Sequence, residues 1–353
     1  MVSCAFVIPG DIGMLTGGYA YDRRVLALLP AHGIDVQHVA LPGSYPTPTA
    51  GDLRETERVL AGLPAATVLL MDGLAYGAMP APLVTGLRQR IVALCHHPLA
   101  MEAGVSAECA NALRTTETLA LAQAQHVLVT SAFTGRALQT EFCVASAKIS
   151  VAEPGTDRAV RATGTEAPLQ LLAVGSIVPR KGYDVLARAL AQMRTAPDWR
   201  LVIVGAIRDV AARTALEVQL QARGIDGQSV AQRVTILSGI DDAQLSALYA
   251  KADLFVMPSL YEGYGMVLAE AMARGLPIVC TTGGAAAATA PDAAAIKVAP
   301  GDATAFSAAL DRVLGDRALR RRYADASWLA GQSLPTWDDT ARTIATVLKK
   351  VAA

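Results

Sequence analysis

An excess of charge of either sign is absent from this chain. Among its 353 residues, 31 Lys and Arg balance 31 Asp and Glu, so the formal net charge is zero. Domains that bind nucleic acid through its phosphates carry a basic excess. The balance therefore predicts that nucleic acid is not a partner.

Long apolar runs are also absent. No stretch reaches the roughly 20 apolar residues that a membrane-spanning helix requires. The first segment, MVSCAFVIPG, is apolar but short, and it has neither a basic leader nor a cleavage site. It is expected to form the first strand of a sheet, not a signal peptide. We therefore expect a cytoplasmic protein without integral membrane contact.

Motifs for metals and redox cofactors are missing as well. The five cysteines show no Cys-x-x-Cys pair and no metal-ligand spacing, which is typical of free thiols in a reducing compartment. No Asp-x-Asp stands in a suitable loop, and the adjacent Asp241 and Asp242 suit a helix cap. The loop GDIGMLTGG at residues 10–18 lacks the Gly-x-Gly-x-x-Gly spacing of a nicotinamide dehydrogenase. Neither a metal nor another cofactor is expected.

The chain does have a regular alternation of short apolar runs and longer helical patterns. This alternation is typical of parallel sheets that are covered by helices on both faces. The expected strands are residues 3–8, 36–41, 67–71, 91–95, 127–130, 149–152, 169–174, 200–204, 234–237, 254–257, 277–281 and 295–298. The expected helices are residues 19–32, 50–62, 107–124, 131–141, 183–193, 210–223, 242–251, 266–274, 303–314, 317–330 and 340–351.

The pattern pauses over the polar residues 156–167 and then restarts. It predicts an α/β protein of two Rossmann-like, doubly wound domains facing a central cleft. The expected domains are residues 1–160 and 168–335, with the last helix, about 338–353, packing back on the first. Since ligands bind at the carboxyl ends of strands in open α/β sheets, the loops after the strands are the places to look for a site.

The segment PSLYEGYGMVLAEAMARGLPIV, residues 258–279, carries the most informative pattern. Its glycines argue against one continuous helix, so Glu262 is expected in a loop and Glu270 on the second turn of a helix that begins near Gly265. The first backbone amides of such a helix, at Gly265, Met266 and Val267, lack partners within the helix and attract phosphate. Two carboxylates beside an anion site could bind hydroxyl groups. The alternative is a solvated pair on a surface helix.

This segment resembles the Glu-x7-Glu element of retaining glycosyltransferase family 4, which has the GT-B fold. The resemblance covers nearly the whole chain. LLAVGSIVPRKGYDVLARAL at residues 171–190, LVIVGA at 201–206 and VAPGDATAFSAAL at 298–310 follow in the family's order. GGYAYDRRVLALLPAHGIDV at 17–36, VTSAFTGRAL at 129–138 and VAEPGTD at 151–157 resemble elements of its first domain.

The resemblance implies roles for residues of the second domain. Glu262 would contact the donor sugar, Glu270 the ribose hydroxyls, and Lys181, with Arg180 beside it, the diphosphate. The remaining expected donor-binding residues are Gly17 and Gly18 of the first domain and Gly175, Ser176, Gly205, Gly263, Tyr264, Gly265, Met266 and Val267 of the second. A lysine just before a helix is mildly unfavourable on its own, so Lys181 fits best beside a bound anion.

The first domain is expected to hold the acceptor. His96 and His97 follow the expected strand 91–95, and a histidine near this position is often found in the family contacting the donor sugar or the acceptor. Both are therefore candidate catalytic residues, with a purely structural histidine pair as the alternative. Tyr19, Asp72 and Glu102 are the candidate acceptor-binding residues.

Two departures from the family's pattern affect substrate specificity. Ser176 follows Gly175 where many members have an arginine, which would leave the phosphate to Arg180 and Lys181. The loop TTGGAAAATAPD at residues 281–292 offers alanines where many members have a glutamate. Contacts to the sugar from this loop would then come from the backbone or not at all.

Together these features predict a metal-independent, retaining glycosyltransferase that takes a hexose from a UDP-, GDP- or ADP-sugar. The expected acceptor is a small soluble molecule. Residues 1–160 hold 10 Lys and Arg against 13 Asp and Glu, which does not favour peripheral binding to anionic lipid. The alternatives are a lipid or cell-envelope glycan acceptor at the membrane surface and, in another class, a catalytically inactive nucleotide-sugar-binding protein. The sequence predicts no oligomeric state.

Overall fold

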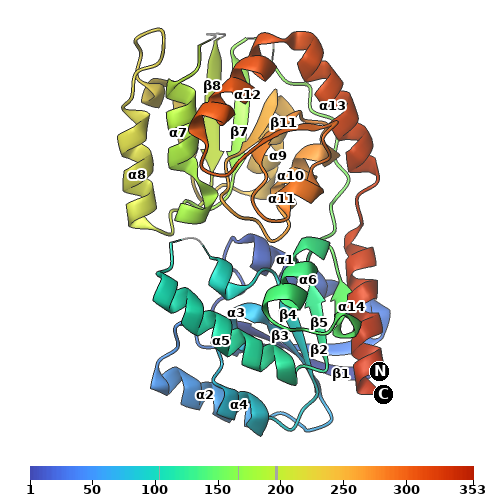
Figure 1. Cartoon of the computed structure of the whole chain (residues 1–353). Helices are drawn as coiled ribbons and strands as arrows, with labels where there is room; N and C mark the ends of the chain where they lie inside the picture. Colours follow the sequence, from blue (N-terminus) through green and yellow to red (C-terminus); the bar gives the residue numbers. More distant parts are fainter. Residues whose placement is uncertain (103, 166, 195–197) are drawn as a thin grey trace. The chain divides into compact units, whose positions relative to one another are not determined.

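The protein is described by a computed structural model that covers residues 1–102, 104–165, 167–194 and 198–353. The chain divides into two compact units. The N-terminal unit consists of Met1–Gly155 together with Pro335–Ala353, and the C-terminal unit consists of Thr156–Leu334 (Figure 1). The last helix thus belongs to the N-terminal unit, although it lies at the far end of the sequence.

The N-terminal unit is built on a six-stranded sheet in the order β2-β1-β3-β4-β5-β6. Every neighbouring pair is parallel. The strands are β1 (Val2–Pro9), β2 (Ile34–Leu41), β3 (Val68–Asp72), β4 (Ile91–Cys95), β5 (His126–Val129) and β6 (Ile149–Val151). The central strands β3, β4 and β5 are buried along their whole length, as expected for a sheet covered on both faces.

Helices connect these strands. They are α1 (Gly17–Leu28), α2 (Ala50–Ala61), α3 (Gly73–Tyr76), α4 (Ala81–Gly86), α5 (Ala107–Gln123), α6 (Ala132–Glu141) and the final α14 (Trp337–Ala352), with 3₁₀ turns η1 (Leu29–His32), η2 (Leu99–Met101) and η3 (Ser146–Lys148). The short α3 and α4 were not predicted, because their glycines and prolines obscure any helical period. Among the described residues, no helix has both the length and the apolar character needed to cross a bilayer.

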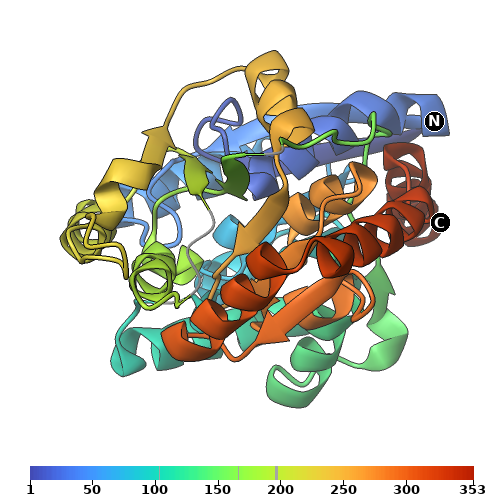
Figure 2. The same ribbon diagram turned by 90° about the horizontal axis from the view of Figure 1, so that it is seen from above.

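Helix α14 packs on the N-terminal unit against α1, β1, β3 and β5. Thr336 and Asp339 form a capping box at its start, which satisfies two backbone donors. The chain passes so close to this start that a Cβ on Gly155 would lie 2.2 Å from the backbone nitrogen of Trp337. Figures 1 and 2 show both chain termini on the same side of this unit.

The C-terminal unit is also built on a parallel six-stranded sheet, in the order β12-β11-β10-β7-β8-β9. Its strands are β7 (Leu169–Val174), β8 (Trp199–Val204), β9 (Val234–Leu237), β10 (Leu254–Met257), β11 (Ile278–Thr281) and β12 (Ala295–Val298). Its helices are α7 (Tyr183–Ala191), α8 (Val210–Leu220), α9 (Asp242–Lys251), α10 (Met266–Ala273), α11 (Ala286–Thr289), α12 (Ala303–Gly315) and α13 (Arg317–Gln332), with 3₁₀ turns η4 (Pro179–Lys181) and η5 (Val230–Arg233).

Alternation along the strands separates two cores in this unit. Leu254 and Val256 of β10 pack with α7, α8 and α12 on one face of the sheet. Phe255 and Met257 pack with α9 and α10 on the other. Side chains of a strand point alternately to opposite faces, so one apolar run serves both cores. The predicted doubly wound α/β class is confirmed for both sheets.

Strand order places a topological switch point in each sheet, where successive crossovers diverge. In the C-terminal unit it lies between β7 and β10, and in the N-terminal unit between β1 and β3. Ligands of open α/β sheets bind beside the carboxyl ends of the strands at such points. The loops after β7 and β10, and those after β1 and β3, are therefore the positions to inspect.

The packing of α14 leads to a stability prediction. Ile344 is fully buried on this helix, and Ile344→Ala should lower the free energy of unfolding by about 2–5 kcal/mol because it leaves a cavity. Thr346→Ala, at an exposed position of the same helix, should change it by less than about 0.5 kcal/mol. Urea denaturation of the full chain measures both, and equal effects would mean that the helix does not contribute its apolar face to the core.

Candidate functional site

Two loops meet at the switch point of the C-terminal unit. One follows β7 and contains Arg180 and Lys181 in η4, and the other follows β10 and contains Glu262. The backbone N–H of Leu260 donates to the carbonyl of Arg180 at 2.7 Å, which joins the loops. Gly182 has a φ of +62° and passes so close that a Cβ would lie 2.4 Å from the carbonyl oxygen of Pro258. Only glycine fits here, so the basic pair is held against the second loop.

Lys181, Arg180 and Glu262 form one ionic cluster. Lys181 Nζ donates to Glu262 Oε1 at 2.6 Å, and Arg180 lies 3.4 Å from Glu262 Oε2. Arg180 also donates to the carbonyl of Tyr261 at 2.9 Å. The side chains are only 14%, 17% and 8% exposed, respectively, so solvent screens the cluster little.

The electrostatics of this cluster keep the glutamate charged. Burial by itself raises the pKa of Glu262, but the charges of Lys181 and Arg180 and the hydrogen bond from Lys181 outweigh it and bring the pKa to about 2. Glu262 is thus an anion at every physiological pH. The cluster has two cations and one anion, which leaves a net positive charge available to a second anion.

The glycine-alanine loop after β11 fixes the backbone of Glu262. The N–H of Glu262 donates to the carbonyl of Gly283 at 3.2 Å, and the N–H of Ala285 donates to the carbonyl of Glu262 at 2.8 Å. A Cβ on Gly284, whose φ is +64°, would lie 2.3 Å from that same carbonyl oxygen. Gly283, Gly284 and Ala285 of this loop therefore act through their backbone, as a support for Glu262.

Helix α10 begins at the same edge of the sheet. Its N-cap is Gly265, with a φ of +90°, and no side chain of the described residues caps it. The N–H groups of Met266 and Val267 in its first turn have no acceptor within the helix, and the helix dipole adds positive potential there. Tyr264 just before the cap is buried, and its carbonyl accepts from Thr289 Oγ1 at 2.5 Å.

Glu270 lies on the second turn of α10, as the sequence predicted. Tyr249 of α9 donates its hydroxyl to Glu270 Oε2 at 2.9 Å. The Arg274 guanidinium stacks over the Tyr249 ring at 4.4 Å from its centroid. Burial raises the pKa of Glu270, and the Tyr249 hydrogen bond and the charge of Arg274 oppose this rise. One carboxylate oxygen of Glu270 is thus oriented by Tyr249, and Oε1 is the oxygen free of that bond.

Gly175 and Gly205 follow β7 and β8 and lie in backbone contact. A Cβ on Gly205 would come within 1.9 Å of the carbonyl oxygen of Gly175, so the two loops can approach this closely only with glycine at position 205. The Tyr183 hydroxyl donates to that carbonyl at 2.9 Å. Ser176, next to Gly175, is partly exposed at the end of β7. These contacts shape a backbone-lined surface beside Lys181.

In the N-terminal unit, Gly17 and Gly18 form the first residues of α1. Thr16 caps this helix by accepting from the N–H of Tyr19 at 3.2 Å. Tyr19 is buried and donates its hydroxyl to the carbonyl of Pro9 at 2.6 Å, which leaves little of its ring to stack on a ligand. A Cβ on Gly18 would lie 3.6 Å from the imidazole of His96, so α1 begins directly beside that ring.

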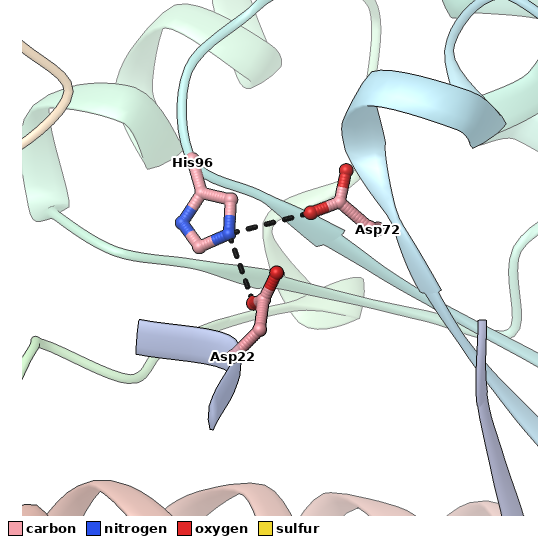
Figure 3. A group of neighbouring side chains, drawn as sticks. All are labelled: Asp22, Asp72 and His96. Carbon is pink, nitrogen blue, oxygen red and sulfur yellow. Dashed lines mark hydrogen bonds and ion pairs between the residues drawn. The ribbon is translucent and has the colours of Figure 1, made fainter. Parts of the chain in front are cut away.

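His96 lies between two carboxylates (Figure 3). Its Nε2 is 3.2 Å from Oδ1 of Asp22 on α1 and 3.6 Å from Oδ2 of Asp72 at the end of β3. The Asp72 side chain also caps α3 by accepting from the N–H of Leu74 at 2.6 Å. Asp22 is fully buried, Asp72 is 3% exposed, and the imidazole faces partly outward. The three residues come from the loops and helix at this unit's switch point.

His97 contacts a different carboxylate from the two that flank His96. Its Nε2 is 2.8 Å from Oε2 of Glu102, beyond the turn η2. The buried Glu117 of α5 accepts from the N–H of Leu99 at 2.9 Å and so anchors the same turn. The structure therefore pairs four of the predicted residues, His96 with Asp72 and His97 with Glu102.

The sequence did not point to Asp22, Tyr249 or the role of Gly283 and Gly284. Asp22 and Tyr249 lie inside helices, whereas the loops after strands are where the sequence predicted a site. A charged residue on the apolar face of an amphipathic helix is the signal that could have identified Asp22. The sequence pointed to the loop of Gly283 and Gly284 only for its alanines, which stand where many members of the family have a glutamate.

Comparison with known proteins fits this geometry. The family model "Glycosyl transferases group 1" matches residues 157–327. The chain is 27% identical over 330 residues to the MMP α-(1→4)-mannosyltransferase of Mycolicibacterium hassiacum, which covers 88% of this chain and 76% of that protein. It is 29% identical to the D-inositol 3-phosphate glycosyltransferase of Salinispora tropica, over 58% of this chain and 47% of that protein.

Solved structures show the same fold. Sucrose-phosphate synthase from Thermosynechococcus elongatus superposes with a TM-score of 0.82 at 21% identity, covering 99% of both chains. Anabaena HepE, solved with UDP and glucose, superposes with a TM-score of 0.76 at 18% identity, covering 99% of this chain and 100% of HepE. The predicted GT-B fold is confirmed by these matches.

The support of Glu262 by the glycine-alanine loop can be tested by a pair of substitutions. Gly284→Ala and Gly301→Ala both place a Cβ at a positive φ, +64° and +80°, which costs roughly 1–2 kcal/mol. Only the first meets the Glu262 carbonyl, since nothing lies within 4 Å of a Cβ at Gly301. Gly284→Ala should therefore lower the free energy of unfolding by more than Gly301→Ala in urea denaturation. Equal losses would contradict the close contact.

Proposed function

We propose that the chain is a retaining, metal-independent glycosyltransferase that takes a hexose from a nucleoside-diphosphate sugar, because residues 157–327 match the family model of the glycosyl transferases group 1 and most of the chain aligns with a mannosyltransferase. The C-terminal unit would bind the donor and the N-terminal unit the acceptor. The donor is a UDP-, GDP- or ADP-sugar, since all three present the same ribose and diphosphate.

The observation that carries this proposal is the ionic cluster at the switch point of the C-terminal unit. Breaking a sugar–phosphate bond leaves negative charge on the departing diphosphate, and fixed cations and amides stabilise that charge in the transition state. Lys181 and Arg180 supply the cations, and the first turn of α10 supplies amides. This chemistry supplies the charge stabilisation that a divalent metal supplies elsewhere.

The two glutamates divide the recognition of the donor. Glu262, charged and fixed beside Lys181, would accept hydrogen bonds from hydroxyls of the sugar. Glu270, with Oε2 held by Tyr249, would offer Oε1 to the ribose hydroxyls. Gly175, Ser176, Gly205, Gly263 and the residues from Tyr264 to Val267 would provide the remaining donor contacts, through the backbone for the most part.

Retention follows in this proposal from a front-face reaction. The acceptor hydroxyl attacks on the side from which the diphosphate departs, and a phosphate oxygen takes up its proton. No carboxylate of the candidate site is assigned as a nucleophile, in contrast to retaining glycosidases. Mass spectrometry of the enzyme quenched with donor should detect no glycosyl adduct, and a trapped glycosyl-enzyme would contradict this mechanism.

We propose a small soluble acceptor, bound at the carboxyl edge of the N-terminal sheet near His96 and His97. The named acceptor of one relative, D-inositol 3-phosphate, supports this choice. A lipid or cell-envelope glycan acceptor is the alternative. Co-sedimentation with vesicles of anionic phospholipid at low salt separates the two, since strong binding to the vesicles would favour the lipid acceptor.

A catalytically inactive nucleotide-sugar-binding protein is the candidate from another class. The intact cluster of Lys181, Arg180 and Glu262 favours catalysis over it. Incubation with UDP-, GDP- and ADP-hexoses in EDTA, followed by assay of released nucleoside diphosphate, tests the proposal. Release of nucleoside diphosphate from one donor supports the transferase function. Binding of a donor without such release, whichever acceptor is added, would favour the inactive protein.

Lys181→Ala provides a kinetic prediction. Because the charge of the leaving group peaks late in the reaction, the substitution should lower kcat by about 100-fold or more. Lys251→Ala removes an exposed lysine at the end of α9 and serves as the control, with kcat expected to stay within about twofold of wild type. Initial rates with the donor that the release assay identifies measure kcat of both variants. An unchanged kcat in Lys181→Ala would remove this residue from the mechanism.

A further inference from the structure

Three titratable side chains gather at the switch point of the N-terminal sheet: Asp22, Asp72 and His96 (Figure 3). Asp22 is fully buried, and its second oxygen, Oδ2, has no hydrogen-bond partner among the described residues. A buried carboxylate without full compensation is costly, so its retention requires a reason. Its other oxygen, Oδ1, lies 3.2 Å from Nε2 of His96.

We propose that Asp22 and Asp72 are positioning residues that hold His96 as an imidazolium, with Nε2–H directed to the two carboxylates and Nδ1–H presented outward to a ligand. His96 would then be a fixed cationic donor in the N-terminal unit. The role of that donor toward a substrate rests on the proposed transferase function, whereas the charge state of His96 does not.

The geometry fixes both the position and the orientation of the ring. The carbonyl of His96 accepts from Thr130 Oγ1 at 3.0 Å, which anchors its backbone. The Tyr21 ring meets the imidazole edge to face, with centroids 5.2 Å apart. Gly18 lies on a further side of the ring, where an added Cβ would be 3.6 Å from the imidazole. The carboxylates gather at Nε2, and the other ring nitrogen, Nδ1, lies on the side away from them (Figure 3).

The surrounding charges favour the protonated ring. Burial would lower the pKa of His96, but the charges of Asp22 and Asp72 and their hydrogen bonds outweigh burial and raise it well above its usual range. Burial also raises the pKa of Asp22, and the neighbouring Asp72 adds to that rise. Tyr21, the other titratable group facing the ring, donates its hydroxyl to the carbonyl of Ala152 and stays neutral.

A protonated imidazole limits what His96 can do. It has no lone pair, so it cannot act as a general base toward an acceptor hydroxyl. It can donate from Nδ1 to a hydroxyl or phosphate oxygen of the ligand and can stabilise negative charge there. The proton of the acceptor must then pass to another group, which is consistent with transfer to the leaving phosphate.

The charge of His96 can be measured on the ligand-free chain. The protein, labelled with ¹³C and ¹⁵N at its five histidines, is titrated by NMR, and His96→Gln assigns the resonance. In wild type, His96 should remain protonated at pH 8, where an ordinary histidine with a pKa of about 6.5 is neutral. Asp22→Asn should lower its midpoint by about 1–3 pH units, since one opposing charge is lost. Glu102→Gln, which alters the partner of His97, should leave the His96 midpoint unchanged.

Asp72→Asn serves as the second carboxylate variant, because asparagine keeps the cap of α3. It should also lower the midpoint, and the wild-type titration decides the matter if neither variant folds. A His96 midpoint near the ordinary value in wild type would overturn the proposal. Broadening of the His96 resonances by equimolar Mn²⁺ would do so too, since a divalent cation at these three side chains would replace the Nε2 proton.

The positioning role has its own readout in the pH profile of the reaction. With the donor found by the release assay, kcat/KM of Asp22→Asn should fall as pH rises through the lowered His96 midpoint. Wild type should show no such fall between pH 6 and about 8. A parallel loss at all pH values would indicate a merely structural role for Asp22. If no donor is turned over, the transferase function fails while the NMR result still stands.

Discussion

The ion pair between Lys181 and Glu262 is the constraint on which the rest of the C-terminal site depends. A cation that is largely removed from water needs a partner, and the glutamate at 2.6 Å provides it. Holding that partner requires two tight backbone approaches, at Gly182 and at Gly284. The glycines at these two approaches are therefore consequences of placing charge at a buried sheet edge, and in the proposed function the diphosphate would add a second anion to cations already fixed.

Both units place their charged residues at the same point of the topology, but the charges that they combine there differ. Each places its charged residues where the crossovers of a doubly wound sheet diverge. In the C-terminal unit two cations share one carboxylate, which favours an anion. In the N-terminal unit two carboxylates share one imidazole, which turns a neutral side chain into a cation. In each unit carboxylates therefore lie against a basic side chain, Glu262 against Lys181 in one and Asp22 and Asp72 against His96 in the other.

The sequence predicted the sheets well, because buried parallel strands are short apolar runs that helical periods separate. It also placed Glu262 in a loop and Glu270 on the second turn of a helix. It assigned Glu262 and Lys181 to different parts of the donor and did not foresee their contact, since that contact depends on β10 pairing with β7 across some eighty residues of chain. Asp22 and Tyr249 escaped notice because they approach the sites from helix interiors. The domain roles and site residues stay predictions.

The proposed donor site in the C-terminal unit should bind a nucleoside diphosphate without a metal. Isothermal titration calorimetry in EDTA, comparing UDP, GDP and ADP with the corresponding nucleosides, tests it most directly. We expect one diphosphate to bind at least about tenfold more tightly than its nucleoside, a difference of about 1.4 kcal/mol, because its phosphates would reach Lys181, Arg180 and the start of α10. Equal affinities of diphosphate and nucleoside, or no binding of any diphosphate, would contradict it.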